Sequence, residues 1–491
     1  MALSAYGFVA YLATYALDTT TDKFMNFIRI PTYLLLLGLL GACSVGPTYH
    51  SPTPALTSTW QAPLPHDGQI SHLDNWWAQY HDATLVKLIE QAQASSPNLD
   101  SAIARIAQAR ANGESTGAGL FPTLDFNAKS IRSKSTPFGS QVFLQTANSV
   151  SLDSAWEIDL FGASRRAREA AVARYDARVA NWHEARVSLA AEVASTYFTY
   201  RACEIAAGNA AADWQSRQQT AALTQLKLAQ QFIPASDAAL AMASTQDAHN
   251  RYLNQQAECA SQRKSLVALT GWDEPALITE LGQQQAKLPD SPMLNINSVP
   301  ADILRQRPDL AAAERDLSAA MADIGIAEAN RYPRISLTGS IGISWLNLNG
   351  ASSQSDTWSF GPALNIPLFD AGKRRANAAL AQAKYDEARA NYELKVRSAV
   401  KETEQALVQL DSTRLRLIDA LASVNSYSQV EHATQLRYQA GTASLLEVED
   451  SKRNLINAQN LYTTLQRDQL TASISLYKAM GGGYTSADKH D

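Results

Sequence analysis

The sequence predicts an α+β membrane protein in which each subunit contributes four transmembrane β-strands, as two hairpins, and long coiled-coil α-helices in two internal repeats. Three observations lead to this fold class. Two motifs recur about 210 residues apart, a spacing typical of a duplicated domain. Four segments alternate polar and apolar residues with a period of two, which is typical of strands with one apolar face. Two runs of about 65 residues are rich in alanine, glutamine and arginine and lack proline, as expected for long helices.

The N-terminal segment has the anatomy of an export signal. Residues 1–42 are predicted to be a signal peptide region, and Met25 is a candidate for the true start. The apolar run before Cys43 has about ten residues, roughly half of what a membrane-spanning helix requires. Leu40-Gly41-Ala42-Cys43 resembles the lipobox of bacterial lipoproteins, which implies cleavage before Cys43 and a covalent lipid on that cysteine. A lipid-anchored linker is therefore expected over 43–74.

The duplicated motifs divide the rest of the chain into two repeats. The matching stretches are residues 157–166 with 365–374, and residues 224–227 with 434–437. Repeat 1 is predicted over 75–280 and repeat 2 over 300–484, with a linker or equatorial segment over 281–299 and a short tail over 485–491. Each repeat is expected to contain, in order, a helix, a β-hairpin and a helical hairpin.

One β-hairpin is predicted in each repeat, over 122–160 and over 334–368. Leu124, Phe126 and Ala128 alternate with polar residues, and the other three strands show the same pattern. Such strands suit a transmembrane barrel with a lipid-facing outer surface and a wet interior, whereas a soluble sandwich usually has shorter strands. The polar residues predicted to line the lumen are Thr123, Asp125, Asn127, Lys129, Asp153, Glu157, Ser336, Thr338 and Ser340.

Four strands cannot close a barrel by themselves. An open sheet edge in lipid leaves backbone groups unpaired at a cost of several kcal/mol each, so the subunit is expected to oligomerise. Three copies would supply twelve strands, an even number within the range of such barrels. Pro362 and Pro367 lack the amide hydrogen that a central strand donates, and they are expected to bend the last strand towards its helix.

Each repeat then continues into a helical hairpin, predicted over 163–270 and over 371–480. At 1.5 Å per residue, a first helix of about 65 residues would span roughly 100 Å. Its many alanines permit close approach of neighbouring helices in a coiled arrangement. Pro234 and Gly441 mark the turns into the return helices.

Two cysteines lie in the first helical hairpin. Cys203 and Cys259 are about equally far from its turn, so antiparallel helices could bring them level. An oxidising compartment would permit a disulfide there. Two small buried thiols are an equally good interpretation, because the rotation of each helix is unknown and disulfide geometry is demanding.

These features together resemble the TolC-like outer-membrane factors, and within them the OprM- and NodT-type lipoprotein subgroup. The shared motifs include Trp76-Trp77, Trp156 to Gly162, Arg307-Pro308-Asp309-Leu310, Gly361-Pro362 to Gly372, Arg437 to Gly441 and Leu476 to Tyr484. The resemblance implies a homotrimer whose twelve-strand barrel in the outer membrane continues as an α-helical tunnel through the periplasm. Drugs, metals or other small solutes would pass passively to the exterior from an inner-membrane pump, expected to be of the RND type, and a periplasmic adaptor.

The resemblance also implies roles for the tips of the helical hairpins. The residues expected to dock the adaptor and narrow the tunnel are Lys227, Leu228, Ser236, Arg437, Tyr438, Gly441, Ser444 and Leu445. Turn chemistry is an equally good reason for Gly441, and the first tip departs from the pattern because Gln231 stands at the corresponding position. Glu447 and Asp450 are candidate gate residues, although charges on a helix usually form a solvated face.

Composition and motifs argue against other classes of protein. A net charge of -5 and a pI of about 6.0 supply no general basic field for nucleic acid. No phosphate loop, nucleophile elbow or Cys/His spacing typical of a metal site occurs, so we expect neither an enzyme nor a cofactor beyond the lipid on Cys43. A periplasmic adaptor and a structural coiled-coil lipoprotein that spans the envelope are the alternatives. Neither accounts for the duplicated amphipathic hairpins.

Overall fold

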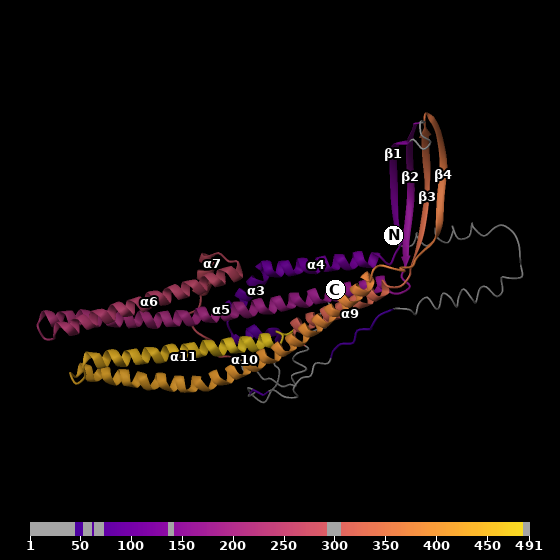
Figure 1. Ribbon diagram of the computed structural model, residues 1–491. Helices are drawn as coiled ribbons and strands as arrows, with labels where there is room; N and C mark the ends of the chain where they lie inside the picture. Colours follow the sequence, from indigo (N-terminus) through magenta and orange to yellow (C-terminus); the bar gives the residue numbers. More distant parts are fainter. Residues whose placement is uncertain (1–44, 53–60, 63–72, 136–141, 292–305, 485–491) are drawn as a thin grey trace. The chain divides into compact units, whose positions relative to one another are not determined.

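The computed structural model describes residues 45–52, 61–62, 73–135, 142–291 and 306–484 (Figure 1). The chain forms two compact units. The first holds the β-strands and includes Gly117–Ala167 and Ile324–Ala378, while the second holds most of the helices. The predicted signal peptide region, Cys43, much of the predicted linkers and the predicted tail lie outside the described residues.

The first unit contains an antiparallel sheet of four strands in the order β1-β2-β3-β4 (Figure 1). The strands are β1 (Thr123–Ser135), β2 (Phe143–Ile158), β3 (Arg334–Leu348) and β4 (Ala351–Asn365). β2 pairs with β3, with Leu152 opposite Ile341, so the two repeats share one sheet. β1 and β4 each pair on one side only, and they form the two edges of this sheet.

Two local features shape β4. Asn349 and Gly350 join β3 to β4, and both have positive φ, the pattern of a two-residue type I′ hairpin. Pro362 lies inside β4, opposite Leu337, so the prediction that it bends the strand towards its helix is wrong. Within one chain β4 pairs on one side only, with β3, and the strand continues past Pro362 to Asn365.

Four long helices form two hairpins (Figure 1). The first hairpin consists of α5 (Ala163–Ala229) and α6 (Ala235–Thr270), and the second consists of α10 (Lys373–Gln439) and α11 (Leu445–Ala479). α5 and α10 have 67 residues each, which corresponds to roughly 100 Å of helix. Among the described helices, none is both long enough and apolar enough to cross a membrane.

Shorter helices precede or follow these hairpins. η2 (Leu73–Tyr80), α3 (Ala83–Ser95) and α4 (Pro97–Ala118) come before the first β-hairpin, and α9 (Pro308–Ala329) comes before the second. α4 and α9 have the same length of 22 residues, as expected for equivalent elements of two repeats. α7 (Glu274–Leu281) follows α6 and was not predicted from the sequence.

The main apolar core lies in the second unit, among helices of both repeats. Trp76 and Phe198 are completely buried, and Trp76 stacks on Tyr477 with ring centroids 5.4 Å apart. Asp82 begins α3 by accepting backbone N–H bonds, and its other carboxylate oxygen accepts the hydroxyl of buried Tyr197 at 2.7 Å. Each large apolar side chain buried in this way contributes roughly 1.5–3 kcal/mol to folding.

Arg307 connects the start of α9 to two other helices. Its guanidinium donates to the backbone oxygen of Ala479 at the end of α11 and to the carboxylate of Glu402 on α10, at 3.0 and 2.8 Å. It also binds Asp309 through two hydrogen bonds. Burial by itself would raise the pKa of Asp309, but the bonds and charge of Arg307 lower it. The Arg-Pro-Asp-Leu motif is therefore a structural anchor of repeat 2.

A short N-terminal segment packs against repeat 2 in the second unit. The backbone N–H groups of Gln61 and Ala62 donate to the two carboxylate oxygens of Glu404, each at 2.8 Å. Upstream, the Tyr49 hydroxyl donates to Glu314 on α9 at 3.4 Å. These contacts fix the course of the described part of the predicted linker.

Candidate functional site

The predicted lumen residues share one face of the sheet. Residues directly opposite each other on neighbouring strands project to the same side. Asp125 lies opposite Asp153, which in turn lies opposite Ser340. The same register pairs Thr123 with Ala155, Ala155 with Thr338, Asn127 with Ser151, Lys129 with Ser149 and Glu157 with Ser336. All of the predicted lumen residues therefore lie on a single polar face.

Hydrogen bonds hold the central carboxylate of this polar face. Asp153 accepts bonds from Asn127 at 2.6 Å, from Ser151 at 2.9 Å and from Ser340 at 2.5 Å, so three strands contribute to one network. Asp125 stands directly opposite it and adds a second carboxylate to the same row. The face is thus polar, ordered and negatively charged at its centre.

The opposite face of the sheet is mostly apolar, with Ser154 and Asp356 as its polar members between the rows of Ile335 and Ile343. One row across all four strands contains Phe126, Leu152, Ile341 and Trp358. The apolar rows extend from Ile335 to Ile343, about 27 Å along β3, which suits the apolar band of roughly 25 Å on transmembrane barrels. Trp358 is 81% exposed and Phe126 is 68% exposed. Side chains of this kind on one face require lipid or another apolar surface.

The two helical hairpins turn with the same backbone geometry. Gln231 at the first tip (residues 227–236) and Gly441 at the second tip (residues 437–445) both have positive φ, 58° and 73°. At the first tip the bonds are Phe232 N–H to Lys227 O at 2.9 Å and Gln231 N–H to Leu228 O at 2.8 Å. At the second they are Thr442 N–H to Arg437 O at 2.8 Å and Gly441 N–H to Tyr438 O at 3.0 Å. Both are Schellman motifs, so Gln231 changes the residue without changing the turn.

Side chains connect the first tip to the second. Lys227 donates to the Tyr438 hydroxyl at 3.3 Å, and its Nζ lies 5.5 Å from the centre of the same ring. Arg437 donates to the backbone oxygen of Thr442 and to Glu447, both at 3.3 Å. The structure thus brings Lys227 and Tyr438 together across the two hairpins, while Arg437 contacts the turn of its own hairpin.

Ser444 and Glu447 form a capping box at the start of α11, whose first residue is Leu445. Ser444 accepts the Glu447 N–H at 3.2 Å, and its own N–H donates to Glu447 at 2.6 Å. This backbone bond is the main reason that the pKa of Glu447 is lowered. A candidate gate residue thus has a structural role at a helix end. Ser236 of the first tip donates to the neighbouring Asp237 at 3.3 Å.

The other charges near the second tip behave differently from one another. Asp450 is exposed and pairs with Arg453 on the same helix. Glu449 is buried and pairs with Arg217 of α5 at 2.9 Å. Arg217 also binds Asp213 at 2.8 Å. Glu449 therefore does not belong to a solvated face, because it is buried against Arg217 of α5. Sequence alone could not reveal this pair, which joins distant segments.

Cys203 and Cys259 form a disulfide between α5 and α6. Of the two interpretations of their spacing, the structure has the bridged one. The bridge encloses a chain separation of 56 residues that includes the first tip.

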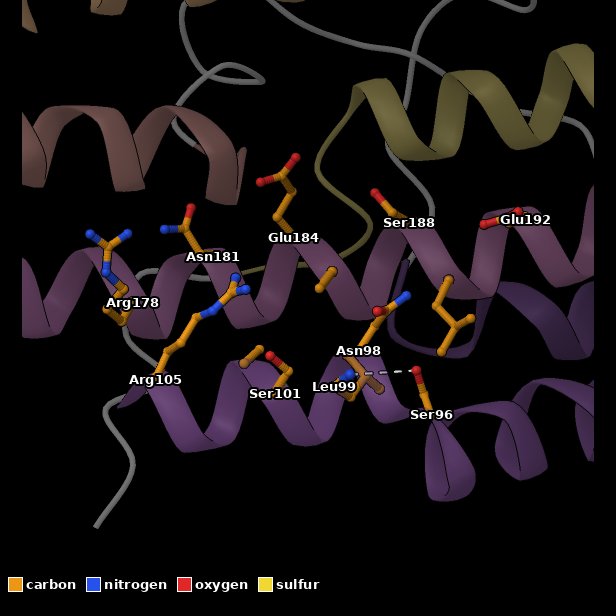
Figure 2. Close-up of a pocket in the computed structure, with 13 residues that line it drawn as sticks. Ser96, Asn98, Leu99, Ser101, Arg105, Arg178, Asn181, Glu184, Ser188 and Glu192 are labelled. Carbon is orange, nitrogen blue, oxygen red and sulfur yellow. Dashed lines mark hydrogen bonds between the residues drawn. The ribbon is translucent and has the colours of Figure 1, made fainter. Parts of the chain in front are cut away.

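A pocket of about 480 Å³ between α4 and α5 gave no signal in the sequence (Figure 2). Leu99 and Ala102 contribute apolar surface, while Arg105 and Arg178 extend polar groups at one end. In repeat 2, Tyr49 packs against the corresponding apolar surface of α9. Among the described residues, no group of three or more His, Cys, Asp or Glu side chains could hold a metal ion.

Comparison with known proteins decides the family. The sequence profile described as outer membrane efflux protein matches residues 88–272 and 299–482. The chain belongs to the outer membrane efflux protein family. The resemblance to TolC-like outer-membrane factors is thereby confirmed, over both repeats.

Relatives of this outer membrane efflux protein match along almost their whole length. The solvent efflux pump outer membrane protein SrpC of Pseudomonas putida is 31% identical over 481 residues, covering 94% of this chain and 99% of the relative. The outer membrane protein OprJ of Pseudomonas aeruginosa is 30% identical over 462 residues, covering 92% and 95%. Nodulation protein T of Rhizobium leguminosarum bv. viciae is 27% identical over 468 residues, covering 94% and 95%.

Solved structures of similar channels confirm the α+β fold class. The outer-membrane channel OprN is 28% identical and has a TM-score of 0.78, covering 90% of this chain and 99% of that one. The open state of the MtrE outer membrane channel of Neisseria gonorrhoeae is 26% identical and has a TM-score of 0.76, covering 90% and 98%.

Family membership fixes the broad function of this outer membrane efflux protein. It is an outer-membrane channel subunit of an efflux system and thus a transport protein. The alternatives of a periplasmic adaptor and of a structural coiled-coil lipoprotein are set aside, because the matched relatives are outer-membrane components of efflux pumps.

Proposed function

We propose that three copies of this chain close a twelve-strand barrel in the outer membrane and continue it as an α-helical tunnel into the periplasm. The single observation that carries the proposal is a four-strand sheet with two unpaired edges. β1 has 13 residues and β4 has 15, so each edge presents a long row of backbone groups. Unpaired groups cost several kcal/mol each in lipid, so pairing between copies is strongly favoured. Three copies give twelve strands, an even number within the range of outer-membrane barrels.

The barrel interior is assigned to the polar face that contains Asp125, Asp153 and Ser340. Solutes would cross it by diffusion, with no bond made or broken, so we propose no catalytic role for the chain. The apolar face that contains Phe126 and Trp358 would meet lipid. Both assignments rest on the uneven distribution of side chains in the sheet, whose one face carries the row Asp125, Asp153, Ser340 and Ser359 and whose other face carries the row Phe126, Leu152, Ile341 and Trp358.

An anchor and partners complete the proposed assembly. A covalent lipid on Cys43 would hold each subunit to the outer membrane, since every buried CH₂ of an acyl chain contributes roughly 0.8 kcal/mol. A periplasmic adaptor and an RND-type inner-membrane pump would deliver solutes to the tunnel. Names of relatives support a pump partner, because they describe outer membrane proteins of solvent, toluene and antibiotic efflux pumps.

The tips are assigned to adaptor docking and tunnel closure. Lys227 and Tyr438 connect the two hairpins of one chain at their ends, where Leu228, Ser236, Gly441, Ser444 and Leu445 also lie. Breaking the Lys227–Tyr438 contact would free the second tip to move. Glu447 and Asp450, one turn beyond it, are proposed to face the tunnel mouth.

Single-channel conductance of the purified oligomer in a planar bilayer tests barrel, closure and conduction together. We expect discrete conductance steps that are rare in the wild type. Tyr438→Phe removes the hydrogen bond to Lys227 but keeps the ring for the cation–π contact, whereas Lys227→Met removes both contacts. Channel openings should therefore be more frequent in Tyr438→Phe than in the wild type, and most frequent in Lys227→Met. Lys384→Met, which changes an exposed lysine elsewhere on α10, is the control. Absence of conductance in all four proteins would contradict the proposal.

A further inference from the structure

Large apolar side chains are uncovered at the base of the sheet, which is the end where Pro122 and Pro333 lead into β1 and β3. Phe121 is 68% exposed, and Leu368 and Phe369, which follow β4, are 92% and 91% exposed. They lie next to the two unpaired sheet edges, since Phe121 precedes β1 and Phe369 follows β4. Exposed apolar groups gathered at such places are typical of protein interfaces.

The internal repeat supplies covered counterparts of these residues. Phe369 in the stretch Ile-Pro-Leu-Phe corresponds to Phe161 in Ile-Asp-Leu-Phe, and Phe121-Pro122 corresponds to Tyr332-Pro333. Phe161 stacks on Tyr332 with ring centroids 4.7 Å apart and planes 21° from parallel. Each chain thus holds one complete aromatic pair at the β2–β3 contact and one unpaired half at each outer edge.

We propose that β4 of one copy pairs with β1 of the next copy in the register that places Ile366 opposite Leu124, and that Phe369 of one copy stacks on Phe121 of the next. This inference rests on the proposed function, because it specifies how the copies of the barrel join.

The register follows from the β2–β3 contact. There Ile158 lies opposite Ile335. Replacing each residue by its counterpart in the other repeat gives Ile366 opposite Leu124, and the next rows follow from it. The rows on the apolar face pair Leu364 with Phe126 and Pro362 with Ala128. The rows on the polar face pair Asn365 with Asp125 and Ala363 with Asn127. A slip of one residue would turn every apolar side chain of one strand towards the polar face.

Charges further along the two edges agree with this register. It places Asp356 of β4 opposite Lys134 of the next copy. Within one chain, Asp356 lies opposite Ile343 and Lys134 lies opposite Leu144, so neither faces an opposite charge in its own sheet. The same register brings Trp358 opposite Arg132, a pair suited to a cation–π contact. Opposite charges across a strand pair stabilise it.

The register also closes a barrel of reasonable shape. Following opposite residues from Asp125 through Asp153, Ser340 and Ser359 leads, across the proposed edge, to Ile131 of the next copy. Each copy therefore shifts the register by about six residues, and three copies shift it by roughly 60 Å along the strands. The circumference measured across twelve strands is roughly 58 Å. The corresponding strand tilt is about 45°, which agrees with the range of about 35–45° for outer-membrane barrels.

Cysteine crosslinking of the full-length protein in its native membrane tests the register. The chain carrying Asn365→Cys and Asp125→Cys should give covalent trimers under oxidising conditions, and so should Leu364→Cys with Phe126→Cys. Two adjacent rows are used because antiparallel rows alternate between closer and more distant pairs. The matched controls are Glu157→Cys with Ser336→Cys and Trp156→Cys with Leu337→Cys, which occupy the corresponding rows inside one chain.

Out-of-register pairs decide between the alternatives. Asn365→Cys combined with Thr123→Cys or with Asn127→Cys keeps the polar face but shifts the pairing by two residues. We expect about tenfold less covalent trimer from these, because diagonal neighbours lie roughly 7–8 Å apart. Higher yield from a shifted pair would overturn the register and leave the proposed trimer intact. A chain that stays monomeric, with both internal controls bridged, would overturn the proposed function as well.

A charge exchange tests the same contact without cysteines. Asp356→Lys should lower the temperature at which the trimer dissociates in detergent, because it faces Lys134 of the next copy. Adding Lys134→Asp should restore the wild-type temperature. Failure of the second change to rescue the first would count against the proposed register, since a general loss of stability is not reversed by the partner change.

Discussion

Gln231 and Gly441 occupy the same place in two turns of the same geometry. A left-handed conformation costs a residue with a Cβ atom roughly 1–2 kcal/mol, whereas glycine adopts it readily. A Cβ at Gly441 would meet nothing within 4 Å, so any effect of adding one comes from the backbone. The residue at this position should therefore set how firmly each tip is closed.

We expect Gly441→Ala to destabilise the second tip by about 1 kcal/mol and Gln231→Gly to stabilise the first by a similar amount. Hydrogen exchange of the tip amides, followed by mass spectrometry, measures both changes. Exchange in Gly441→Ala that equals the wild type would show that the turn is held by contacts instead of by its backbone conformation.

Glu447 makes the second tip sensitive to acid. Its pKa lies below the ordinary value of 4.5, first because of the Ser444 N–H, so its stabilising effect is complete above about pH 4.5 and is lost as the pH falls through the lowered pKa. We expect tip amides after Ser444 to exchange faster below that pH. Glu447→Gln, which cannot ionise, should remove this pH dependence when the two proteins are compared at the same pH. An unchanged dependence in the variant would assign it to another group.

Among the elements that the structure describes, the first helical hairpin carries a disulfide. The disulfide joins Cys203 to Cys259, 56 residues apart. In the chain-entropy account it lowers the entropy of the unfolded hairpin and so stabilises the folded hairpin by about 4 kcal/mol. Replacing both cysteines by serine should therefore lower the unfolding temperature of α5 and α6, and reductant should do the same to the wild type. The double variant should be indifferent to reductant. A second drop on adding reductant to it would mean that reductant acts elsewhere.

Elements with strong local periodicity could be predicted, and contacts between distant elements could not. Alternation along Leu124–Ala128 and its counterparts predicted the strands and their polar face, and the long proline-free runs predicted α5 and α10. The prediction for Pro362 was wrong because whether a strand continues through a proline depends on its pairing with other strands, which no local pattern shows. The Arg217–Glu449 pair depends on how two helices rotate against each other, which no local pattern specifies.

At the scale of the whole molecule, the chain is a duplicated unit whose two β-hairpins join into one open sheet. β2 pairs with β3 inside the chain, while β1 and β4 each keep one unpaired side, and among the described residues the aromatic pair Phe161–Tyr332 lies at the β2–β3 contact. The same interface chemistry can therefore serve within and between copies.

Attachment to the membrane is a property of the whole molecule that one residue should control. Cys43→Ala should abolish incorporation of a radiolabelled fatty acid, because the acylated thiol is removed. Cys203→Ser with Cys259→Ser is the control and should keep the label. Label that persists on Cys43→Ala would contradict the proposed anchor and leave the channel assignment untouched.

The hold of Glu404 on the N-terminal segment has a consequence for how this protein can evolve. Its carboxylate binds the main chain at Gln61 and Ala62, and not their side chains. Every residue except proline offers the same N–H group. Position 61 is exposed and can accordingly drift through most substitutions, whereas position 62 is buried and needs a small residue. Selection should therefore act more strongly on Glu404, which is far away in the sequence, than on the identity of most residues in the N-terminal segment that it binds.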